Sequence, residues 1–195
     1  MNDKNLMNKA ADSIRILAAS AVEKAKSGHP GGAMGGADFI NVLYSEYLKY
    51  DPQNPEWVGR DRFFLDPGHM APMLYSQLTL IGKFTLDELA QLRQWGSPTT
   101  GHPEFEIARG IENTSGPLGQ GHVFAVGAAI AAKFLALIQA TLLSIRKPST
   151  HISLTVVSRR RSLRVQLAWL LCSDSTTSSC STTATTSSSL PRLRK

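Results

Sequence analysis

Residues 101–121, GHPEFEIARGIENTSGPLGQG, constrain the fold more than any other stretch of the chain. Five glycines, two prolines and one histidine fall within it. Glycine is entropically costly to order and proline lacks an N–H donor, so such a stretch is poorly suited to a regular core element. It suits a loop that brings backbone close to a ligand. The small, apolar residues that follow predict a helix over 121–135, whose first turn would aim free N–H groups at this loop. An ordinary Gly/Pro-rich loop is the alternative for this stretch alone.

Two further histidines lie in similar Gly-His turns. His29 belongs to SGHPGG, His69 belongs to DPGHM, and His102 lies at the start of the stretch 101–121. Histidine changes protonation near neutral pH and serves acid–base chemistry, so three such turns predict one shared pocket. A structural role is the alternative for each histidine, and it is the role we expect for His122.

With SGHPGG, DRFFLDPGHM, TGHPE and SGPLGQG in this order, the sequence resembles the transketolase family from about residue 8 to residue 135. The matching part is the N-terminal half, which holds the diphosphate end of thiamine diphosphate. The resemblance implies transfer of a two-carbon ketol unit between sugar phosphates by a cytoplasmic homodimer that uses thiamine diphosphate and Mg²⁺. The cofactor carries the bond breaking, and the protein supplies positioning, proton transfer and electrostatics.

The resemblance also implies roles for residues in the matching motifs. His29 and His102 correspond to residues that face the reacting oxygens of the substrate. His69 corresponds to a cofactor contact near the diphosphate. The remaining cofactor contacts, on the aminopyrimidine side, would be Gly116, Pro117 and Leu118.

The order of elements predicts an α/β fold, as expected for the N-terminal part of a parallel-sheet thiamine-diphosphate-binding domain. Apolar spacing, a capping box at Thr85–Glu88 and stop signals predict four helices, which cover residues 6–26, 37–48, 86–92 and 121–135. Residues 62–65 are short and apolar and predict a buried parallel strand. His69 would then lie just beyond the carboxyl end of this strand, where open α/β sheets bind ligands.

Charge and glycine divide the chain near residue 135. Residues 1–135 carry 12 Lys/Arg and 14 Asp/Glu, whereas residues 136–195 carry 9 and 1. All 15 glycines precede residue 128, although average usage would place about four in a sixty-residue tail. The Ser/Thr-rich end has no periodic apolar face and predicts disorder. The domain organisation we expect is therefore an incomplete cofactor-binding domain over 1–135 and a separate tail over 136–195.

The genetic code offers a reason for this division. Suppose that the codons of the tail are read one base out of register. The codons up to Val165 are then compatible with the string AYISDGGIQEEISQG, which is similar to the continuation of a transketolase. Thr155 and Thr185 would then stand where the family has its Asp and Asn metal ligands. We therefore expect an out-of-frame tail, no metal ligands in this chain, and doubtful binding of the cofactor. The chain would be a truncated fragment that is inactive alone.

Two other functions remain open. The chain could be the cofactor-binding subunit of a two-chain transketolase, or a non-enzymatic binding protein with a basic tail. Arg/Lys clusters bind phosphates, but Trp169 is the only aromatic residue in the tail, so we expect no nucleic-acid partner. No apolar run has the length of a bilayer span and the N-terminus lacks the pattern of a signal peptide, so we expect no membrane partner and a cytoplasmic location.

Overall fold

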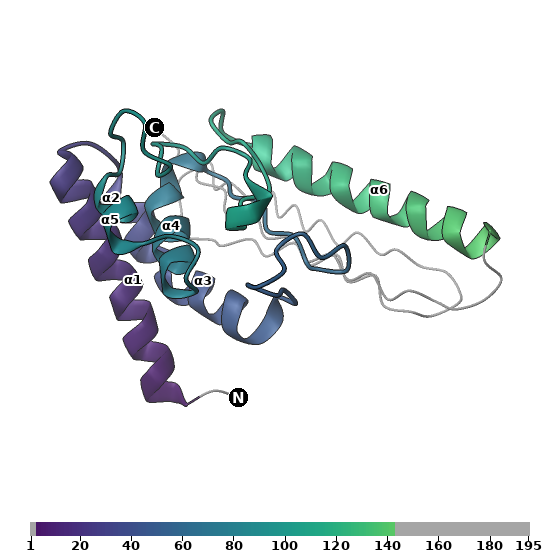
Figure 1. Ribbon diagram of the computed structural model, residues 1–195, viewed down its shortest axis with the longest axis horizontal. Helices are drawn as coiled ribbons and strands as arrows, with labels where there is room; N and C mark the ends of the chain where they lie inside the picture. Colours follow the sequence, from purple (N-terminus) through teal and green to yellow (C-terminus); the bar gives the residue numbers. More distant parts are fainter. Residues whose placement is uncertain (1–2, 143–195) are drawn as a thin grey trace, which may run out of the picture.

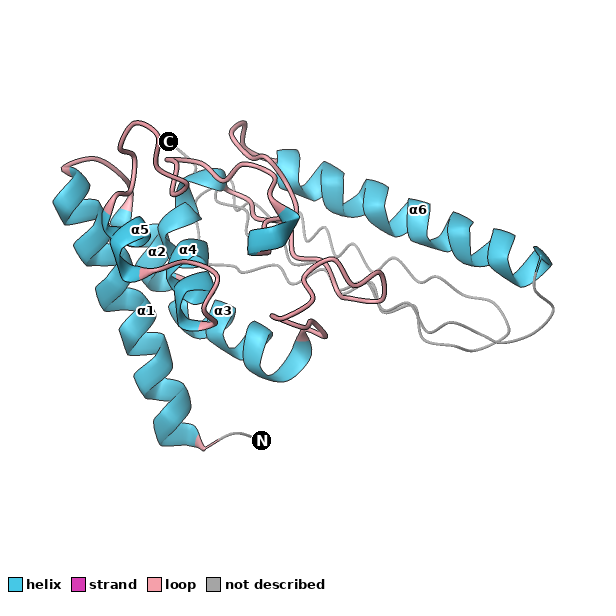
Figure 2. Cartoon of the chain, viewed as in Figure 1, coloured by secondary structure: helices cyan, strands magenta, loops and turns pink. Residues whose placement is uncertain are grey.

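The computed structural model describes residues 3–142, with side chains as far as residue 136. Helices dominate this part of the chain, and loops join them (Figure 2). A group of helices surrounds one hydrophobic core, and the last helix, α6, extends away from that group (Figure 1). No helix in the described range has the length and apolarity that crossing a membrane requires.

The first helix, α1 (Lys4–Ala25), confirms the predicted N-terminal helix. Its N-terminus is capped by Asp3, whose carboxylate accepts a hydrogen bond of 3.0 Å from the Asn5 N–H. One face of α1 enters the core and contacts α2, α3 and α4. Its buried residues are Ala11, Ile14, Ala18, Ala21 and Val22. The helix was predicted from the apolar series Leu6, Ala10, Ile14, Leu17 and Ala21. Of that series Ile14 and Ala21 are buried, whereas Leu6 is 62% exposed.

Two short helices follow. The helix α2 (Pro30–Gly35) was not predicted, because three of its six residues are glycine, which disfavours a helix interior. The predicted second helix is present as α3 (Ala37–Val42), which continues into a π-helical turn, η1 (Leu43–Tyr47).

The central helix α4 (Ala71–Leu80) is buried over eight consecutive residues, from Ala71 to Leu78. A helix that is buried on every side has no polar face, so no amphipathic period could reveal it. The next helix, α5 (Leu86–Ala90), begins at the predicted capping box. Thr85 Oγ1 accepts from the Glu88 N–H at 3.1 Å, and Glu88 Oε2 accepts from the Thr85 N–H at 2.8 Å. It ends before the predicted limit at Leu92, which lies in the following turn.

The predicted strand at residues 62–65 is not formed: the described residues contain no β-strand, only an isolated bridge between Glu106 and Ile111. The segment is buried as predicted, with Phe63, Phe64 and Leu65 at most 5% exposed. The side chain of Asn113 takes both backbone groups of Leu65, accepting from its N–H at 3.1 Å and donating to its C=O at 3.4 Å. A strand needs a neighbouring strand. Among the described residues, the backbone of Leu65 instead bonds to the side-chain amide of Asn113.

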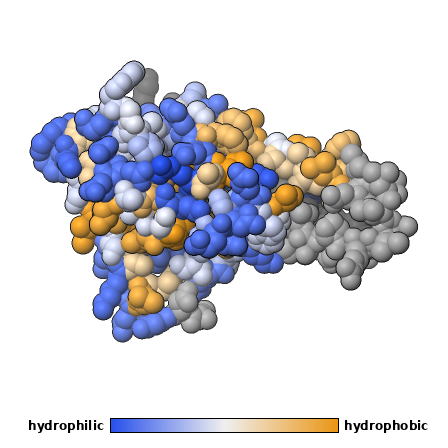
Figure 3. All heavy atoms as spheres, in the orientation of Figure 1, coloured by the Kyte–Doolittle hydropathy of each residue, from blue (hydrophilic) through white to orange (hydrophobic). Residues whose placement is uncertain are grey.

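The last helix, α6 (Gln120–Leu142), confirms the helix predicted from residue 121 and continues beyond residue 135. Phe64 and Ala125 form a small second cluster with Ala128 and Ala129, which packs α6 against the 62–65 segment. The helix also exposes large apolar side chains, and Figure 3 shows apolar surface in this region. These side chains are Val123, Phe124, Val126, Ile130, Phe134 and Leu135.

Candidate active site

His29 occupies the junction between α1 and α2. Lys26 adopts a left-handed conformation after α1, and Gly28 follows with φ 139°, a conformation that side chains rarely adopt. A Cβ at Gly28 would also lie 3.2 Å from a methyl group of Val22. The chain therefore turns sharply at Gly28. His29 then begins α2 as its N-cap residue, and Pro30 follows at the first helical position.

The helix α2 packs closely against the turn that carries His69, and this contact places His69 next to His29. His69 lies in a short 3-10 turn, η2 (Gly68–Met70), which leads into α4. Gly32 faces the Met70 side chain, which would lie 3.0 Å from a Cβ at that position. Because this face of α2 has no side chain, the two segments pack closely. The rings of His29 and His69 are 4.7 Å apart between centroids and tilted by 48°.

The third Gly-His turn reaches the same place through Gly68. A Cβ at Gly68 would lie 2.6 Å from Ser115 Oγ and 3.0 Å from His102 Cδ2. Only glycine fits this contact without a shift. The structure thus brings together three segments that lie far apart in sequence, and with them His29, His69 and His102.

The environment of His102 favours its neutral form. Burial lowers the pKa of His102, and the positive charges of Arg93 and His29 lower it further. A charged imidazole loses hydration when buried and is repelled by neighbouring cations. A neutral ring carries one donor and one acceptor nitrogen, so at neutral pH it can either give or take a hydrogen bond.

A chain of hydroxyl groups holds the turn that carries His102. Thr100 Oγ1 donates to the carbonyl oxygen of His102, so its single proton is in use. The 3.1 Å contact between Tyr75 Oη and Thr100 Oγ1 must then have Tyr75 as the donor. Burial raises the pKa of Tyr75 to about 12, so the phenol keeps this proton. Tyr75 belongs to the buried face of α4, and it ties the turn to the core.

Arg93 links two of the histidine turns. Its Nη1 donates to Ser27 Oγ at 3.0 Å, and its guanidinium lies against Gly101, 3.1 Å from the position of a Cβ there. Arg93 has φ 62°, which is uncommon for a residue other than glycine. Sequence reasoning missed this residue, since nothing in the local pattern distinguishes it from a surface arginine after a short helix.

The predicted cofactor residues Gly116, Pro117 and Leu118 lie in one loop before α6. Gly116 has open space on the side of a Cβ, and Leu118 is 64% exposed. Ser115, directly before them, has a buried Oγ with no protein partner. The loop is therefore open to a ligand at Gly116 and Leu118, whereas the Ser115 hydroxyl is enclosed next to Gly68.

Two N–H groups at the start of α6, where free N–H groups were predicted, have partners in the protein. The Gly119 N–H donates to Asp66 Oδ1 at 3.2 Å, and the Gln120 N–H donates to the Pro117 carbonyl at 3.3 Å. Asp66 Oδ2 also lies 2.6 Å from His122 Nδ1. The carboxylate of Asp66 therefore occupies part of this helix end, on the Gly119 N–H. Sequence reasoning missed Asp66, although its position directly before the Pro-Gly-His turn is a usable signal.

The described part of the chain holds no group of three or more His, Cys, Asp or Glu side chains that could bind a metal ion. Thr155 and Thr185, which stand at the expected metal-ligand positions, lie outside the described residues. So do the rest of the predicted tail from residue 143 onward and the predicted disorder.

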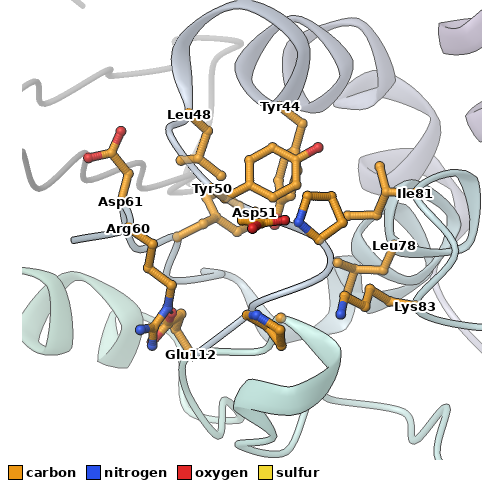
Figure 4. A pocket seen from close by; sticks show the side chains of 14 residues that line it. Tyr44, Leu48, Tyr50, Asp51, Arg60, Asp61, Leu78, Ile81, Lys83 and Glu112 are labelled. Carbon is orange, nitrogen blue, oxygen red and sulfur yellow. The ribbon is translucent and has the colours of Figure 1, made fainter. Parts of the chain in front are cut away.

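A separate hollow lies beside the core and is shown in Figure 4. Its lining includes Tyr44, Tyr50, Arg60 and Glu112, and none of the three histidines. The cavity measures about 40 Å³. A water molecule needs roughly 10–15 Å³ of such volume and a ligand pocket roughly 300–1,000 Å³. This cavity therefore has room for a few waters and is too small for a cofactor.

Buried ion pairs next to this hollow hold together two chain segments that lead to the site. Glu112 binds Arg60 Nε at 2.7 Å and Arg62 Nη1 at 2.9 Å, and both Arg60 and Glu112 are nearly inaccessible to solvent. Removing one member of such a set would leave a buried charge unpaired, which is strongly destabilising. These pairs hold residues 60–62 beside residue 112. The segments that continue to Asp66 and Ser115 therefore run together into the site.

Comparison with known proteins identifies the family of the chain. The family model for the transketolase thiamine diphosphate binding domain matches residues 6–144. Transketolase-1, chloroplastic, of Arabidopsis thaliana is 53% identical over 136 residues, which are 69% of this chain and 18% of that protein. Transketolase 1 of Escherichia coli K12 is 53% identical over 127 residues, which are 65% of this chain and 19% of that protein.

Solved structures give the same result. Transketolase from Leishmania mexicana matches with a TM-score of 0.69 at 43% identity, over 77% of this chain and 22% of that one. Transketolase from Campylobacter jejuni matches with a TM-score of 0.61 at 43% identity, over 68% of this chain and 21% of that one. The family model and the fold matches therefore identify a transketolase thiamine diphosphate binding domain. The chain belongs to the transketolase family, as its motifs predicted, and spans about a fifth of the length of these relatives.

Proposed function

We propose that this chain is the N-terminal part of a transketolase that transfers a two-carbon ketol unit between sugar phosphates. The observation that carries the proposal is the convergence of three Gly-His turns beside one Gly/Pro-rich loop. His29 and His69 are in ring contact, and Gly68 joins His102 to Ser115. Three segments spread over more than seventy residues have no structural need to present histidines at one place.

The residues present fit the organic part of the cofactor. Gly116 has open space on the side of a Cβ, and Leu118 in the same loop is 64% exposed, so a cofactor can approach this loop. Thiamine diphosphate, when bound, supplies an electron sink for breaking a carbon–carbon bond. We propose that Gly116, Pro117 and Leu118 hold its aminopyrimidine side, and that His69 contacts it near the diphosphate.

The other two histidines would serve the substrate. His29 and His102 would bind and orient the hydroxyl and carbonyl oxygens of the sugar at the reacting carbons. Since the pKa of His102 is lowered by burial and by nearby cations, its ring is neutral at neutral pH and can hold or accept a proton at one nitrogen. Arg93 keeps this side of the site positive, which suits an anionic sugar phosphate.

The residues present do not fit Mg²⁺, which is normally held by carboxylates, phosphates and water. Among residues 3–136 no suitable cluster exists. We therefore propose that this chain by itself does not bind thiamine diphosphate with Mg²⁺ tightly and has no activity, and that its tail is out of frame. In the whole protein we propose that residues 62–65 pair as a strand of a parallel sheet, and that the enzyme is a cytoplasmic homodimer.

The test compares the chain as it stands with a repaired chain. The repaired chain has its reading frame restored after about residue 135 and carries the remaining domains of the family. We expect it to transfer ketol units, and we expect His29→Ala or His102→Ala to lower kcat/KM by about 10²-fold or more, the range of one proton-transfer or positioning group. The matched control is Val58→Ala, whose side chain is 80% exposed and lies outside the site. A repaired enzyme that is indifferent to both histidines would refute the roles proposed for them.

A further inference from the structure

Asp66 is buried beside the candidate site, and its charge has two partners among the described residues. Its side chain is 2% exposed. One carboxylate oxygen accepts from the Gly119 N–H at 3.2 Å and the other lies 2.6 Å from His122 Nδ1. A buried carboxylate is costly unless hydrogen bonds or opposite charges compensate it. Both compensating groups come from the start of α6.

The two contacts of Asp66 join parts of the site that lie 53 and 56 residues apart in the sequence. Asp66 precedes the turn that carries His69 by three residues. Gly119 and His122 flank the first residues of α6, directly after the loop 115–118. The start of that loop is held by a bond of 3.0 Å from the Ser115 N–H to the Pro103 carbonyl. Asp66 thus holds the other end of the loop through its hydrogen bond from the Gly119 N–H.

The backbone leaves little slack around this contact. A Cβ at Gly121 would lie 2.6 Å from Asp66 Cβ and 2.8 Å from the Leu65 carbonyl oxygen. The helix start therefore rests directly on the segment that ends in Asp66. The loop itself contributes little packing, since Pro117 and Leu118 are exposed and Gly116 faces open space.

The direction of the helix adds to the contact. A carboxylate at the N-terminal end of a helix is stabilised by the helix dipole and by unpaired N–H groups. The side chain of His122, in the first turn of α6, contacts the same carboxylate. Its ring is partly exposed, with 39% of the side chain accessible, whereas Asp66 is enclosed.

We propose that Asp66 and His122 form a clamp that positions the loop 115–120 against the turn that carries His69. Both are positioning residues, because they act on the site through the segments they join. The importance of this loop for a cofactor rests on the proposed function. The existence of the clamp does not, so the two can fail separately.

Hydrogen exchange of the full 195-residue chain tests the clamp without any cofactor. We expect His122→Ala to raise the exchange rates of the amides at 116–121 by at least about tenfold, the effect of losing one charge-assisted hydrogen bond, while α1 and α4 change little. Alanine favours a helix more than histidine does, so a loosened loop cannot be ascribed to a weaker α6. The matched variant His122→Asn keeps an N–H donor near the place of Nδ1 and is expected to restore most of the protection.

Nitrogen-15 NMR of the imidazole rings supplies the second readout. We expect His122 Nδ1 to carry a proton in the native chain at neutral pH. We also expect the ring signals of His69 and His102 to shift in Asp66→Asn and His122→Ala, and to return in His122→Asn. A purely stabilising contact would not move these rings. An unprotonated Nδ1, or an exchange increase in His122→Ala that is equal throughout the chain, would overturn the clamp. Absence of thiamine diphosphate binding would bear on the proposed function alone.

Discussion

The contact between α6 and the 62–66 segment predicts opposite effects of the same substitution at two positions of one helix. Gly121→Ala places a methyl group 2.8 Å from the Leu65 carbonyl oxygen and 3.1 Å from its carbon. Carbon atoms prefer separations of about 3.5–4.0 Å, so the backbone itself must move. Gly127→Ala, in the same helix, meets no atom within 4 Å.

The magnitudes follow from these distances. Overpacking against atoms that cannot rotate away destabilises by about 1–3 kcal/mol, and the shift would also stretch the bond from Gly119 to Asp66. At Gly127 only helix propensity changes, which stabilises by up to about 1 kcal/mol. We therefore expect the free energies of unfolding of the two variants to differ by about 1–4 kcal/mol, with the native chain between them.

Urea unfolding followed by far-ultraviolet circular dichroism measures this difference. The denaturant slope should stay constant for both variants if only stability changes. Folded spectra in the absence of urea provide the control that each chain retains its helices. If Gly121→Ala is as stable as the native chain while Gly127→Ala is stabilised, the close approach of α6 to Leu65 is wrong.

Four further outcomes are expected. Tyr75→Phe removes the donor to Thr100 and should lower the free energy of unfolding by about 0.5–1.5 kcal/mol in urea titrations, and equal stability would contradict the hydroxyl chain. The pKa of His102 is lowered from 6.5, so the unfolded chain binds a proton at His102 more readily than the native chain does. The stability of the native chain relative to His102→Gln should therefore be constant above pH 6.5 and fall as the pH drops through the lowered pKa. Paired thermal melts at several pH values measure this difference. Calorimetry should detect no tight, Mg²⁺-dependent binding of thiamine diphosphate by the chain alone, and micromolar affinity would show that the metal site has been misplaced. Sequencing of the coding DNA should find a frame disruption between about codons 135 and 147, whereas stop codons or unrelated residues in the shifted frame would rule it out.

Local sequence determined the elements whose signals lie within a few residues of one another. The capping box at Thr85 needs only Glu88, and the stop after α1 needs only the left-handed turn that ends at Gly28. The apolar spacing of α1 is visible because its other face is exposed to water. The motifs around the three histidines also lie within short windows, so the family could be predicted from the sequence, together with the positions to compare.

Tertiary structure decided everything that depends on a partner far along the chain. The buried helix α4 has no polar face and therefore no period. Residues 62–65 have no neighbouring strand among the described residues, where Asn113 bonds to the backbone groups of Leu65. The meeting of His29, His69 and His102 depends on Gly32 and Gly68, whose missing side chains let segments touch. Local patterns register propensity and period. They do not register which distant atom will occupy the space beside a glycine or beside a buried carboxylate such as Asp66, and it was those contacts that brought the histidines and the loop together.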